Sequence, residues 1–350
     1  MKILIISTPV QAIGQGEGGG IDITLLNIIN ALSPLGHQFT VLAPTGSKLS
    51  ADATLIEISG RLQTSVQTES ASTPATMSHD STIVSMCRYA QTHQDQFDVI
   101  LNMAYDWLPI WLTTFFTTPI HHLVSMSNEN QTVADAIEEL NRMMPQRIAF
   151  HSHASANTFQ LENPVTIIAN GFEFTNFPFC KSPKQQLAWV GRISPEKGLE
   201  NALEVANKVN LPLHIWGKVQ SESYQQQLVE KFPEVDIHWR GFVPQQQLLK
   251  EMSQSALMLM TPSWIEAFGN NVVEANACGV PVIAYNKGGP TETVISGVTG
   301  YLVENNEDMA NRVADALKLS RYHCRDSAQQ RFSIEQYALK LQSWLSLNID

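Results

Sequence analysis

Short apolar runs alternate with helix-like segments along most of the chain, and this alternation restricts the folds that are open to it. In the first half the apolar runs occupy residues 3–6, 39–43, 99–101 and 122–126, with a helical pattern over residues 21–35. In the second half they occupy residues 187–190, 213–216, 237–239, 257–260, 282–285 and 301–303, with helical patterns over 198–209, 223–231 and 245–253. Such alternation is typical of βαβ units around a parallel sheet. The sequence therefore predicts an α/β protein with two doubly wound, Rossmann-like domains.

The length of 350 residues also favours two domains, since one domain commonly has ~150 residues. Residues 170–184 have no clear period and contain Pro178 and Pro183, which suits a linker between the domains. We expect an N-terminal domain at residues 1–180, a C-terminal domain at 181–330 and a terminal helix within 331–350. The period of this helix does not reveal the domain on which it packs.

The charge of the chain and its cysteine content indicate which partners are not expected to bind it and in which cell compartment it is expected. Acidic side chains outnumber basic ones by 33 to 22, which argues against nucleic acid or an anionic membrane as a partner. The four cysteines lack paired spacing and indicate reduced thiols, hence a cytoplasmic location. No apolar run approaches the ~18 residues that a membrane span needs. The run at residues 3–6 is also too short for a signal peptide.

Two carboxylates flank a Phe-Gly break in the segment 266–274, Glu-Ala-Phe-Gly-Asn-Asn-Val-Val-Glu. Gly269 is expected to end the loop, so that a helix begins near Asn270 and offers its free N–H groups to a phosphate. Glu266 then lies in the loop, where it can meet sugar hydroxyls, and Glu274 lies about a turn inside the helix. The alternative is a capped surface helix with two solvated acids.

A glycine-rich segment, residues 14–20, follows the first apolar run and contains Gly-x-Gly-x-x-Gly. A nicotinamide site is disfavoured, because residues 8–13 separate the glycines from the strand and no acidic residue ends the second strand. Gly18, Gly19 and Gly20 would still let backbone N–H groups approach an anion or a sugar. A flexible turn without a ligand is the alternative.

A second anion site is predicted at residues 189–198, Trp-Val-Gly-Arg-Ile-Ser-Pro-Glu-Lys-Gly. Arg192 offers a fork for two oxygens and Lys197 a compact charge, which together suit a diphosphate. A charged surface turn is the alternative. No Asp-x-Asp occurs in the chain. His151 with His153, and His121 with His122, lack nearby ligands at metal-site spacing and are interpreted as residues at a strand end and before a strand.

Taken together, these segments resemble the family-4 retaining glycosyltransferases of the GT-B fold, in which two Rossmann-like domains face each other across a cleft. The resemblance covers most of the chain and is strongest over residues 187–303. It rests on the glycine-rich loop, on Gly-Arg-x-x-x-Glu-Lys-Gly, and on Glu-Ala-Phe-Gly followed by Glu274. A narrower resemblance to cyanobacterial UDP-glucose:tetrahydrobiopterin glucosyltransferases rests on residues 7–10, 16–20, 42–47, 105–109 and 122–126.

The resemblance implies a donor site for a nucleotide sugar, UDP-glucose in the narrower case. Arg192 and Lys197 would hold the diphosphate, Glu266 the sugar and Glu274 the ribose. The remaining donor residues, which would border the sugar, phosphate or base, are Gly18, Gly19, Gly20, Arg240, Phe242, Val243, Ala267, Phe268, Gly269, Asn270 and Asn271.

The resemblance places the acceptor on the first domain, where Tyr105, Asp106 and Trp107 follow one strand and Asn128 and Glu129 the next. An aromatic face and a carboxylate suit a flat pterin such as tetrahydrobiopterin, with Asp106 orienting the acceptor hydroxyl. The alternative is that Asp106 caps a helix and Trp107 lies in the core. Many relatives have His where Tyr105 stands, so a His-based role is not expected here.

The expected reaction is metal-independent transfer of glucose with retention, in which the leaving phosphate takes the acceptor proton. Arg192, Lys197, Glu266 and Asp106 are the expected catalytic residues, acting by orientation and by stabilisation of the leaving group. Transfer to a lipid or polysaccharide precursor, a sugar-nucleotide epimerase and a non-catalytic nucleotide-sugar-binding protein remain alternatives. The epimerase would turn over donor without acceptor, and the binding protein would form no product. Oligomeric state does not follow from the sequence.

Overall fold

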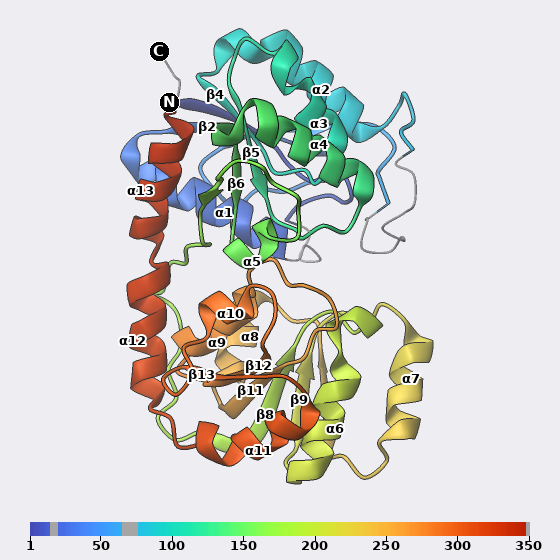
Figure 1. Ribbon diagram of the computed structural model, residues 1–350, viewed down its shortest axis with the longest axis vertical. Coiled ribbons are helices and arrows are strands. Elements are labelled where there is room, and N and C mark those ends of the chain that lie inside the picture. The colour runs from blue at the N-terminus through green and yellow to red at the C-terminus, as the bar shows by residue number, and fades with distance from the viewer. Residues whose placement is uncertain (15–19, 65–75, 348–350) are drawn as a thin grey trace. The chain divides into compact units, whose positions relative to one another are not determined.

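The computed structural model describes residues 1–14, 20–64 and 76–347 and divides into two compact units. The first unit comprises residues 1–172 and 334–350, and the second comprises residues 173–333 (Figure 1). The chain therefore crosses between the units twice. The first crossing lies eight residues before the expected boundary at residue 180.

The first unit contains a sheet of seven strands in the order β3-β2-β1-β4-β5-β6-β7, and every pairing is parallel. Its strands are β1 (Lys2–Ile6), β2 (Gln38–Pro44), β3 (Thr54–Ile58), β4 (Val99–Asn102), β5 (Ile120–Val124), β6 (Ile148–Phe150) and β7 (Thr166–Ile167). Its helices are α1 (Gly20–Leu32), α2 (Thr82–His93), α3 (Trp107–Trp111), α4 (Gln131–Met143), α5 (His153–Ala156) and α13 (Ile334–Leu345).

The second unit contains a six-stranded parallel sheet in the order β10-β9-β8-β11-β12-β13. Its strands are β8 (Lys184–Val190), β9 (Leu213–Trp216), β10 (Ile237–Gly241), β11 (Ser255–Met260), β12 (Val282–Tyr285) and β13 (Gly300–Val303). Its helices are α6 (Leu199–Val209), α7 (Glu222–Lys231), α8 (Gln245–Met252), α9 (Asn270–Ala277), α10 (Pro290–Thr293), α11 (Asn306–Ala316) and α12 (Arg321–Phe332).

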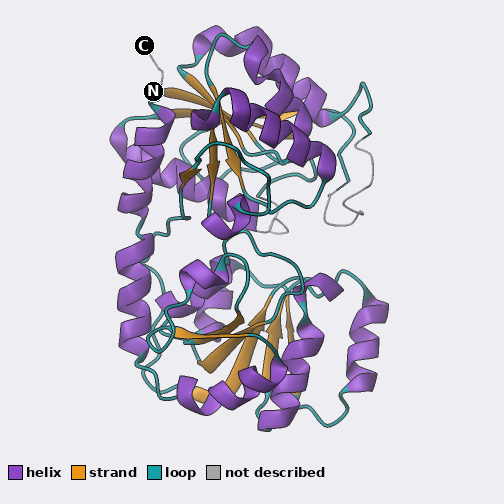
Figure 2. Cartoon of the chain, in the orientation of Figure 1, coloured by secondary structure: helices purple, strands orange, loops and turns teal. Residues whose placement is uncertain are grey.

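Helices lie on both faces of each sheet (Figure 2), and β1 shows why. Ile3 and Ile5 belong to a core cluster that includes residues of α1 and α13, whereas Leu4 and Ile6 belong to a cluster that includes residues of α2. A strand that is apolar on both faces needs cover on both faces, as in other parallel sheets. The two doubly wound parallel-sheet domains expected from the sequence are thus confirmed.

The last two helices belong to different units. α12 packs in the second unit, where its arginines donate to carbonyls at or just after the ends of three helices. Arg321 donates to Ser253 O, Arg325 to Ala277 O and Arg331 to Thr293 O. These carbonyls lack partners within their own helices, and cations at helix C-termini are favourable. α13 packs on α1 in the first unit, which answers the packing question that periodicity left open.

Several elements differ from the sequence-based expectation. β3 and β7 were not predicted, since β3 is an edge strand with partly exposed residues and β7 has only two residues. His121 and His122 lie inside β5 and are buried, so the interpretation that they precede a strand was wrong. Residues 65–75 lie outside the described residues. Within the described part of the chain, no helix has the length and apolar character to cross a membrane.

Candidate functional site

The turn after β8 is held in one conformation by Gly198. This turn joins β8 to α6 and includes the short helix η6 (Pro195–Lys197). Gly198 has a φ of 67°, and a Cβ there would lie 1.8 Å from the carbonyl oxygen of Thr261. Thr261 Oγ1 also donates a hydrogen bond of 2.7 Å to the Gly198 carbonyl. The turn that carries Arg192 and Lys197 is therefore fixed just beyond the end of β11.

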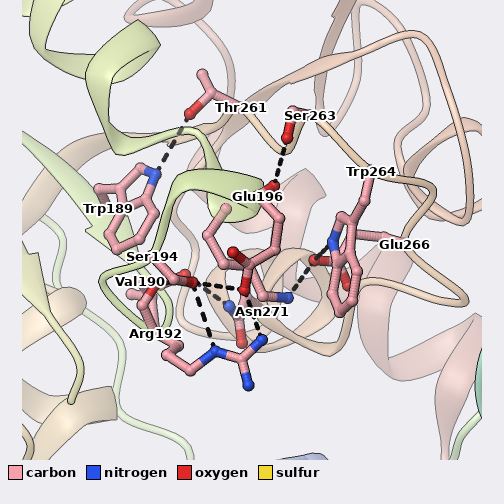
Figure 3. Close-up of polar contacts among 11 residues, drawn as sticks. Trp189, Val190, Arg192, Ser194, Glu196, Thr261, Ser263, Trp264, Glu266 and Asn271 are labelled. Atoms are coloured by element: carbon pink, nitrogen blue, oxygen red, sulfur yellow. Dashed lines mark hydrogen bonds and ion pairs between the residues drawn. The ribbon is translucent and has the colours of Figure 1, made fainter. Parts of the chain in front are cut away.

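Within this turn, the guanidinium of Arg192 lies against Glu196 (Figure 3). Its Nη2 donates to Glu196 Oε1 over 2.6 Å, and Ser194 Oγ donates to the same oxygen over 2.6 Å. Burial acts to raise the pKa of Glu196, but the hydrogen bonds from Ser194 and Arg192 outweigh it and lower the pKa. Arg192 keeps 30% of its side chain exposed, so a ligand can reach it.

Lys197 forms the second ion pair of the site, with Glu266. Its ammonium donates to Glu266 Oε1, and Trp264 Nε1 donates to the same oxygen over 2.7 Å. The ammonium also lies 4.3 Å from the centroid of the Trp264 ring, which is cation–π distance. Both cations of the predicted diphosphate site are thus paired with carboxylates, and the four charges sum to zero.

The loop that leads from Glu266 into α9 is shaped by two glycines. Gly269 has a φ of 88° and immediately precedes α9, so the break and the helix start were predicted correctly. Gly289 N donates to Glu266 O over 2.7 Å, and a Cβ on Gly289 would lie 2.3 Å from the Phe268 backbone. Asn271 Nδ2 donates to Val190 O over 2.8 Å (Figure 3), which ties α9 to the end of β8.

Ala267 is half-buried in this loop, and Asn270 is the first residue of α9. Phe268 is buried, and its ring packs edge-on against Phe332 at 5.6 Å. The side chains of Phe268 and Asn271 therefore have structural contacts of their own. The backbone of residues 268–271 is therefore the part expected to contact a donor.

Glu274 lies in the second turn of α9 and is 2% exposed. Its Oε1 accepts a hydrogen bond of 2.7 Å from Gln245 Nε2. Burial raises the pKa of Glu274 to about 7, against which the hydrogen bond from Gln245 acts only in part. A buried carboxyl group with a perturbed pKa is a common mark of a functional site. The burial of Glu274 contradicts the alternative in which this residue is a solvated acid on a surface helix.

Arg240, Phe242 and Val243 lie at the end of β10, the edge strand of the second sheet. Arg240 Nε and Nη2 both lie near His214 Nδ1, at 3.1 and 3.0 Å. Burial, and then the charge of Arg240, lowers the pKa of His214 to about 4. The ring is therefore neutral at pH 7 and can accept from Arg240. Phe242 is 51% exposed, so its ring is available to a ligand.

Backbone contacts bring this segment to the same sheet edge as the Arg192 turn. Gly191 N donates to Trp216 O over 3.0 Å, and Gly217 N donates to Gly241 O over 2.9 Å. A Cβ on Gly217 would lie 1.7 Å from Gly191 O, so the three chain segments meet at a glycine. The carboxyl ends of β8, β9 and β10 thus form one edge, where ligands bind in open parallel sheets.

The predicted acceptor residues of the first unit also gather at one sheet edge. Tyr105 Oη donates to Ser127 O over 3.1 Å and accepts from Glu129 N over 3.3 Å. Asn128 N donates to Thr158 Oγ1 over 2.9 Å. Burial raises the pKa of Tyr105, so its hydroxyl is protonated at pH 7. Tyr105, Asn128 and Glu129 therefore belong to one hydrogen-bonded loop cluster.

Asp106 is the N-cap of α3, and its Oδ1 accepts from Leu108 N over 2.9 Å. It is 7% exposed, and burial raises its pKa. Trp107 is half-buried and packs against the core cluster around α4. The carboxyl group of Asp106 also has a hydrogen bond with the side chain of Gln63. The alternative raised from the sequence, a helix cap, therefore holds for the Asp106 side chain.

Of the glycine-rich loop, Gly20 is the first residue of α1, while Gly18 and Gly19 lie outside the described residues. Two contacts were not predicted from the sequence. One is the hydrogen bond from the Trp264 indole that fixes Glu266, and the other is the hydrogen bond between Ser125 and His151. Trp264 lies two residues before Glu266, but only the fold turns its ring under Lys197. Within the described residues, no group of three or more His, Cys, Asp or Glu is placed to hold a metal ion.

The known proteins to which this chain is similar include several glycosyltransferases. Residues 175–337 match the family model described as "Glycosyl transferases group 1". CapM of Staphylococcus aureus, a capsular polysaccharide biosynthesis glycosyltransferase, is 26% identical over 172 residues, which are 42% of this chain and 43% of CapM. The D-inositol 3-phosphate glycosyltransferase of Mycolicibacterium smegmatis is 34% identical over 156 residues, which are 41% of this chain and 36% of that enzyme. The chain thus spans less than half the length of these curated relatives.

Several solved structures align with nearly the whole chain. Anabaena HepE in complex with UDP and glucose aligns with a TM-score of 0.77 at 19% identity, over 99% of each chain. At this identity the likeness concerns the fold alone, and the fold is the GT-B fold of glycosyltransferases. The family-model match lies almost wholly in the second unit, which contains the Arg192 turn, Glu266 and Glu274.

Proposed function

We propose that this chain is a cytoplasmic, retaining glycosyltransferase that moves glucose from UDP-glucose to a hydroxyl of a small acceptor, tetrahydrobiopterin, without a metal ion. The observation that carries the proposal is the arrangement of Arg192, Lys197, Glu196 and Glu266 at one sheet edge of the second unit. The UDP and glucose bound by HepE, which has the same fold, support a nucleotide sugar as donor.

The diphosphate of the donor exchanges partners with Glu266. The diphosphate carries two negative charges, one on each phosphate, and a phosphate oxygen can take the place of the carboxylate at Lys197 in a charge-assisted hydrogen bond. As Lys197 turns to the phosphate, Glu266 Oε1 loses its ammonium partner and keeps the Trp264 indole N–H. The released carboxylate then accepts hydrogen bonds from the sugar hydroxyls. Donor binding thus converts a closed ion pair into two ligand contacts.

Arg192 stabilises the leaving diphosphate in the transition state. Glu196 and Ser194 hold its guanidinium in place, so little reorganisation is needed when charge develops. Together with Lys197 it supplies the positive charge that a divalent metal supplies in other glycosyltransferases. Activity should therefore persist in excess EDTA. Loss of activity in EDTA, restored by Mg²⁺ or Mn²⁺, contradicts this part of the proposal.

Retention follows from attack on the face that the diphosphate leaves, with a phosphate oxygen taking the acceptor proton. A double displacement needs a carboxylate beneath the anomeric carbon. Glu266 is the acid proposed to bind the sugar, and its contacts with Lys197 and Trp264 suit a hydroxyl-binding role instead. The anomeric configuration of the product, read by NMR, tests retention directly.

The acceptor binds in the first unit beside Tyr105, Asp106, Trp107, Asn128 and Glu129. Asp106 orients the acceptor hydroxyl through a carboxyl group that also accepts from Leu108 N and has a hydrogen bond with the Gln63 side chain. The half-buried ring of Trp107 offers an apolar face to a pterin.

The deciding experiment incubates the protein with mixed nucleotide sugars and a pool of pterins and other small alcohols, followed by mass spectrometry. A glucosylated pterin formed from UDP-glucose supports the full proposal. A sugar product on another alcohol supports glycosyl transfer and rejects the pterin. Epimerised donor without acceptor indicates an epimerase, and donor binding without any product indicates a binding protein.

A further inference from the structure

Three residues that follow neighbouring strands of the first sheet form a hydrogen-bonded chain. Ser125 follows β5, His151 follows β6 and Ile168 follows β7. The parallel register pairs Val124 with Phe150, and Phe150 with Ile167, so the next residue of each strand falls in line. Ser125 Oγ lies 3.0 Å from His151 Nε2, and His151 Nδ1 lies 3.0 Å from Ile168 O.

The directions of these two hydrogen bonds follow from their partners. A carbonyl oxygen only accepts, so His151 Nδ1 must carry a hydrogen and donate to Ile168 O. Burial lowers the pKa of His151 to about 4, so the ring is neutral at pH 7 and Nε2 carries no hydrogen. The hydroxyl of Ser125 therefore donates to Nε2. The oxygen of Ser125, which is half-buried, can only accept a hydrogen bond from a ligand.

The same edge is poor in positive charge. Residues 103–108, 125–130, 151–157 and 168–172, which follow β4 to β7, include Asp106 and Glu129 but no Lys or Arg. The nearest basic residues that follow a strand are Lys48 and Arg61, after β2 and β3 near the opposite side of the sheet. Arg61 is moreover paired with Asp80 at 3.7 Å. The whole first unit has 7 Lys and Arg against 16 Asp and Glu, a net charge of −9.

We propose that the acceptor subsite of the first unit takes a neutral or positively charged acceptor rich in O–H and N–H donors, and rejects acceptors that carry a phosphate. Ser125 is an acceptor-binding residue, and His151 is a positioning residue that fixes the direction of the Ser125 hydroxyl. The inference rests on the proposed transferase function and defines the substrate class that the function leaves open.

The selectivity has a simple electrostatic cause. A phosphate monoester brings about −1.5 to −2 charges at pH 7 and three strong hydrogen-bond acceptors. At this edge it finds the acidic side chains of Asp106 and Glu129 without a Lys or Arg in the segments that follow β4 to β7, and Ser125 has no hydrogen to give it. An amine or a hydroxyl group of the acceptor is favoured at this edge, because each can donate a hydrogen bond to Ser125 and to the acidic side chains. The subsite thus discriminates by repulsion as well as by attraction.

The hydrogen-bond direction is tested on the full-length protein without an acceptor. Long-range ¹H–¹⁵N spectra of ¹⁵N-labelled protein report which ring nitrogen of His151 carries hydrogen. The signal is assigned by its loss in His151→Gln or, should this buried substitution not fold, by its shift in Ser125→Ala. At pH 7 we expect a neutral ring with hydrogen on Nδ1. Hydrogen on Nε2, or a protonated ring at pH 7, overturns the proposal because Ser125 would then be free to donate.

Selectivity is tested with two matched pairs of acceptors and UDP-glucose: neopterin with neopterin 3′-phosphate, and myo-inositol with myo-inositol 1-phosphate. In each pair that reacts, we expect kcat/KM at least about 10-fold higher for the member without phosphate. Equal rates, or preference for the phosphate, overturn the inference. When no pair reacts and no UDP is released, the proposed function fails, and the hydrogen-bond direction alone decides the status of Ser125.

A substitution pair separates binding from structure. Ser125→Ala should lower kcat/KM for the better acceptor by about 3- to 10-fold, the size of one hydrogen bond. Ser125→Thr keeps the hydroxyl and should restore most of it, while the affinity for UDP stays unchanged in both variants. An unchanged kcat/KM in Ser125→Ala overturns the role of Ser125.

Discussion

Among single residues, Arg192 tests the electrostatic account of the donor site most sharply. Its guanidinium is held in place by Glu196 and Ser194, so Arg192→Ala removes a positioned positive charge from the candidate site. We expect kcat to fall about 10²- to 10³-fold, as when one transition-state donor is removed elsewhere. Steady-state kinetics with UDP-glucose measure this. Lys208→Ala, which breaks an exposed ion pair with Glu307, is the matched control and should change little.

Glu274 is a buried carboxyl group whose ionisation affects stability and, if it binds the ribose as proposed, the affinity for the donor. Its pKa is raised from 4.5 to about 7, so the folded protein binds this proton more tightly than the unfolded chain does. Its contribution to stability is therefore complete below pH 4.5 and is lost as pH rises through 7. Glu274→Gln lacks this dependence. At pH 8 we expect the variant to be more stable than the wild type by up to about 3 kcal/mol, with the difference shrinking toward pH 5.

Urea unfolding at pH 5, 6, 7 and 8 measures this difference, and calorimetric titration with UDP measures the accompanying loss of affinity. Weaker UDP binding is expected because an amide accepts fewer hydrogen bonds from the ribose hydroxyls than an ionised carboxylate does. A stability difference that does not change with pH would show that the carboxyl group is not buried as described.

Asp106 caps α3, and its proposed role in orienting the acceptor can be separated from this cap by substitution. Asn is also a good N-cap, so Asp106→Asn should keep the first unit within about 0.5 kcal/mol of its stability, whereas Asp106→Ala loses the cap and about 1 kcal/mol. If the carboxyl group orients the acceptor, both variants lose transfer activity while the affinity for UDP is kept. Thermal unfolding and acceptor kinetics on the two variants separate the roles. Full transfer activity in Asp106→Asn confines this residue to capping.

The sequence predicted some site residues and missed others for a physical reason. Arg192, Lys197, Glu266 and Glu274 lie in short segments whose turns and glycines fix their spacing, so the chemistry can be read locally. Trp264 and the Ser125–His151 pair act through contacts that depend on strand register or ring orientation. Neither is encoded in spacing along the chain. The sequence likewise did not show that both His121 and His122 are buried inside a strand, because buried histidines need partners such as Arg147 and Thr113 that only the fold supplies.

Among the elements, the turn between β8 and α6 depends on its glycine. Gly198→Ala combines a positive φ with a Cβ that would lie 1.8 Å from the carbonyl oxygen of Thr261. The backbone of the β8–α6 turn, or that of Thr261 after β11, must therefore shift. Gly297→Ala is the matched control, since its φ is 79° and its Cβ would meet nothing within 4 Å. We expect the control to lose about 1 to 2 kcal/mol from backbone strain alone, and Gly198→Ala to lose clearly more.

Thermal unfolding of the second unit, followed with and without UDP, checks this prediction. Equal losses in the two variants would mean that the contact with Thr261 is not tight.

Regular elements were the most predictable part of the fold, and residues 213–216 and 282–285 coincide with β9 and β12. Both are fully or almost fully buried strands, for which an apolar run is a direct signal. The partly exposed β3 gives no such signal.

In the whole molecule, the chain ends in the unit where it began. α13 contributes Tyr337, Leu341, Trp344 and Leu345 to the buried core of the first unit. Burying such side chains is worth about 1.5 to 3 kcal/mol each, which is comparable in sum with the stability of a typical domain. A chain truncated after Ser333 should therefore lose the folded first unit and keep a second unit that binds UDP.

Differential scanning calorimetry with UDP titration checks this outcome, and Leu339→Ser, at a position on α13 that is 65% exposed, is the control expected to be neutral. A truncated chain that retains both unfolding transitions would contradict the assignment of α13 to the first core. Helical periodicity alone could not make this assignment, because an amphipathic helix fits either unit equally well.

The central claim is that a donor diphosphate takes Lys197 away from Glu266 while Arg192 remains held by Glu196. A crystal structure of the full chain with UDP tests it most directly. The account predicts phosphate oxygens within hydrogen-bond distance of both Lys197 Nζ and the Arg192 guanidinium, with Glu266 no longer paired to Lys197. UDP bound away from Arg192, or bound there with the Lys197–Glu266 pair intact, would contradict it.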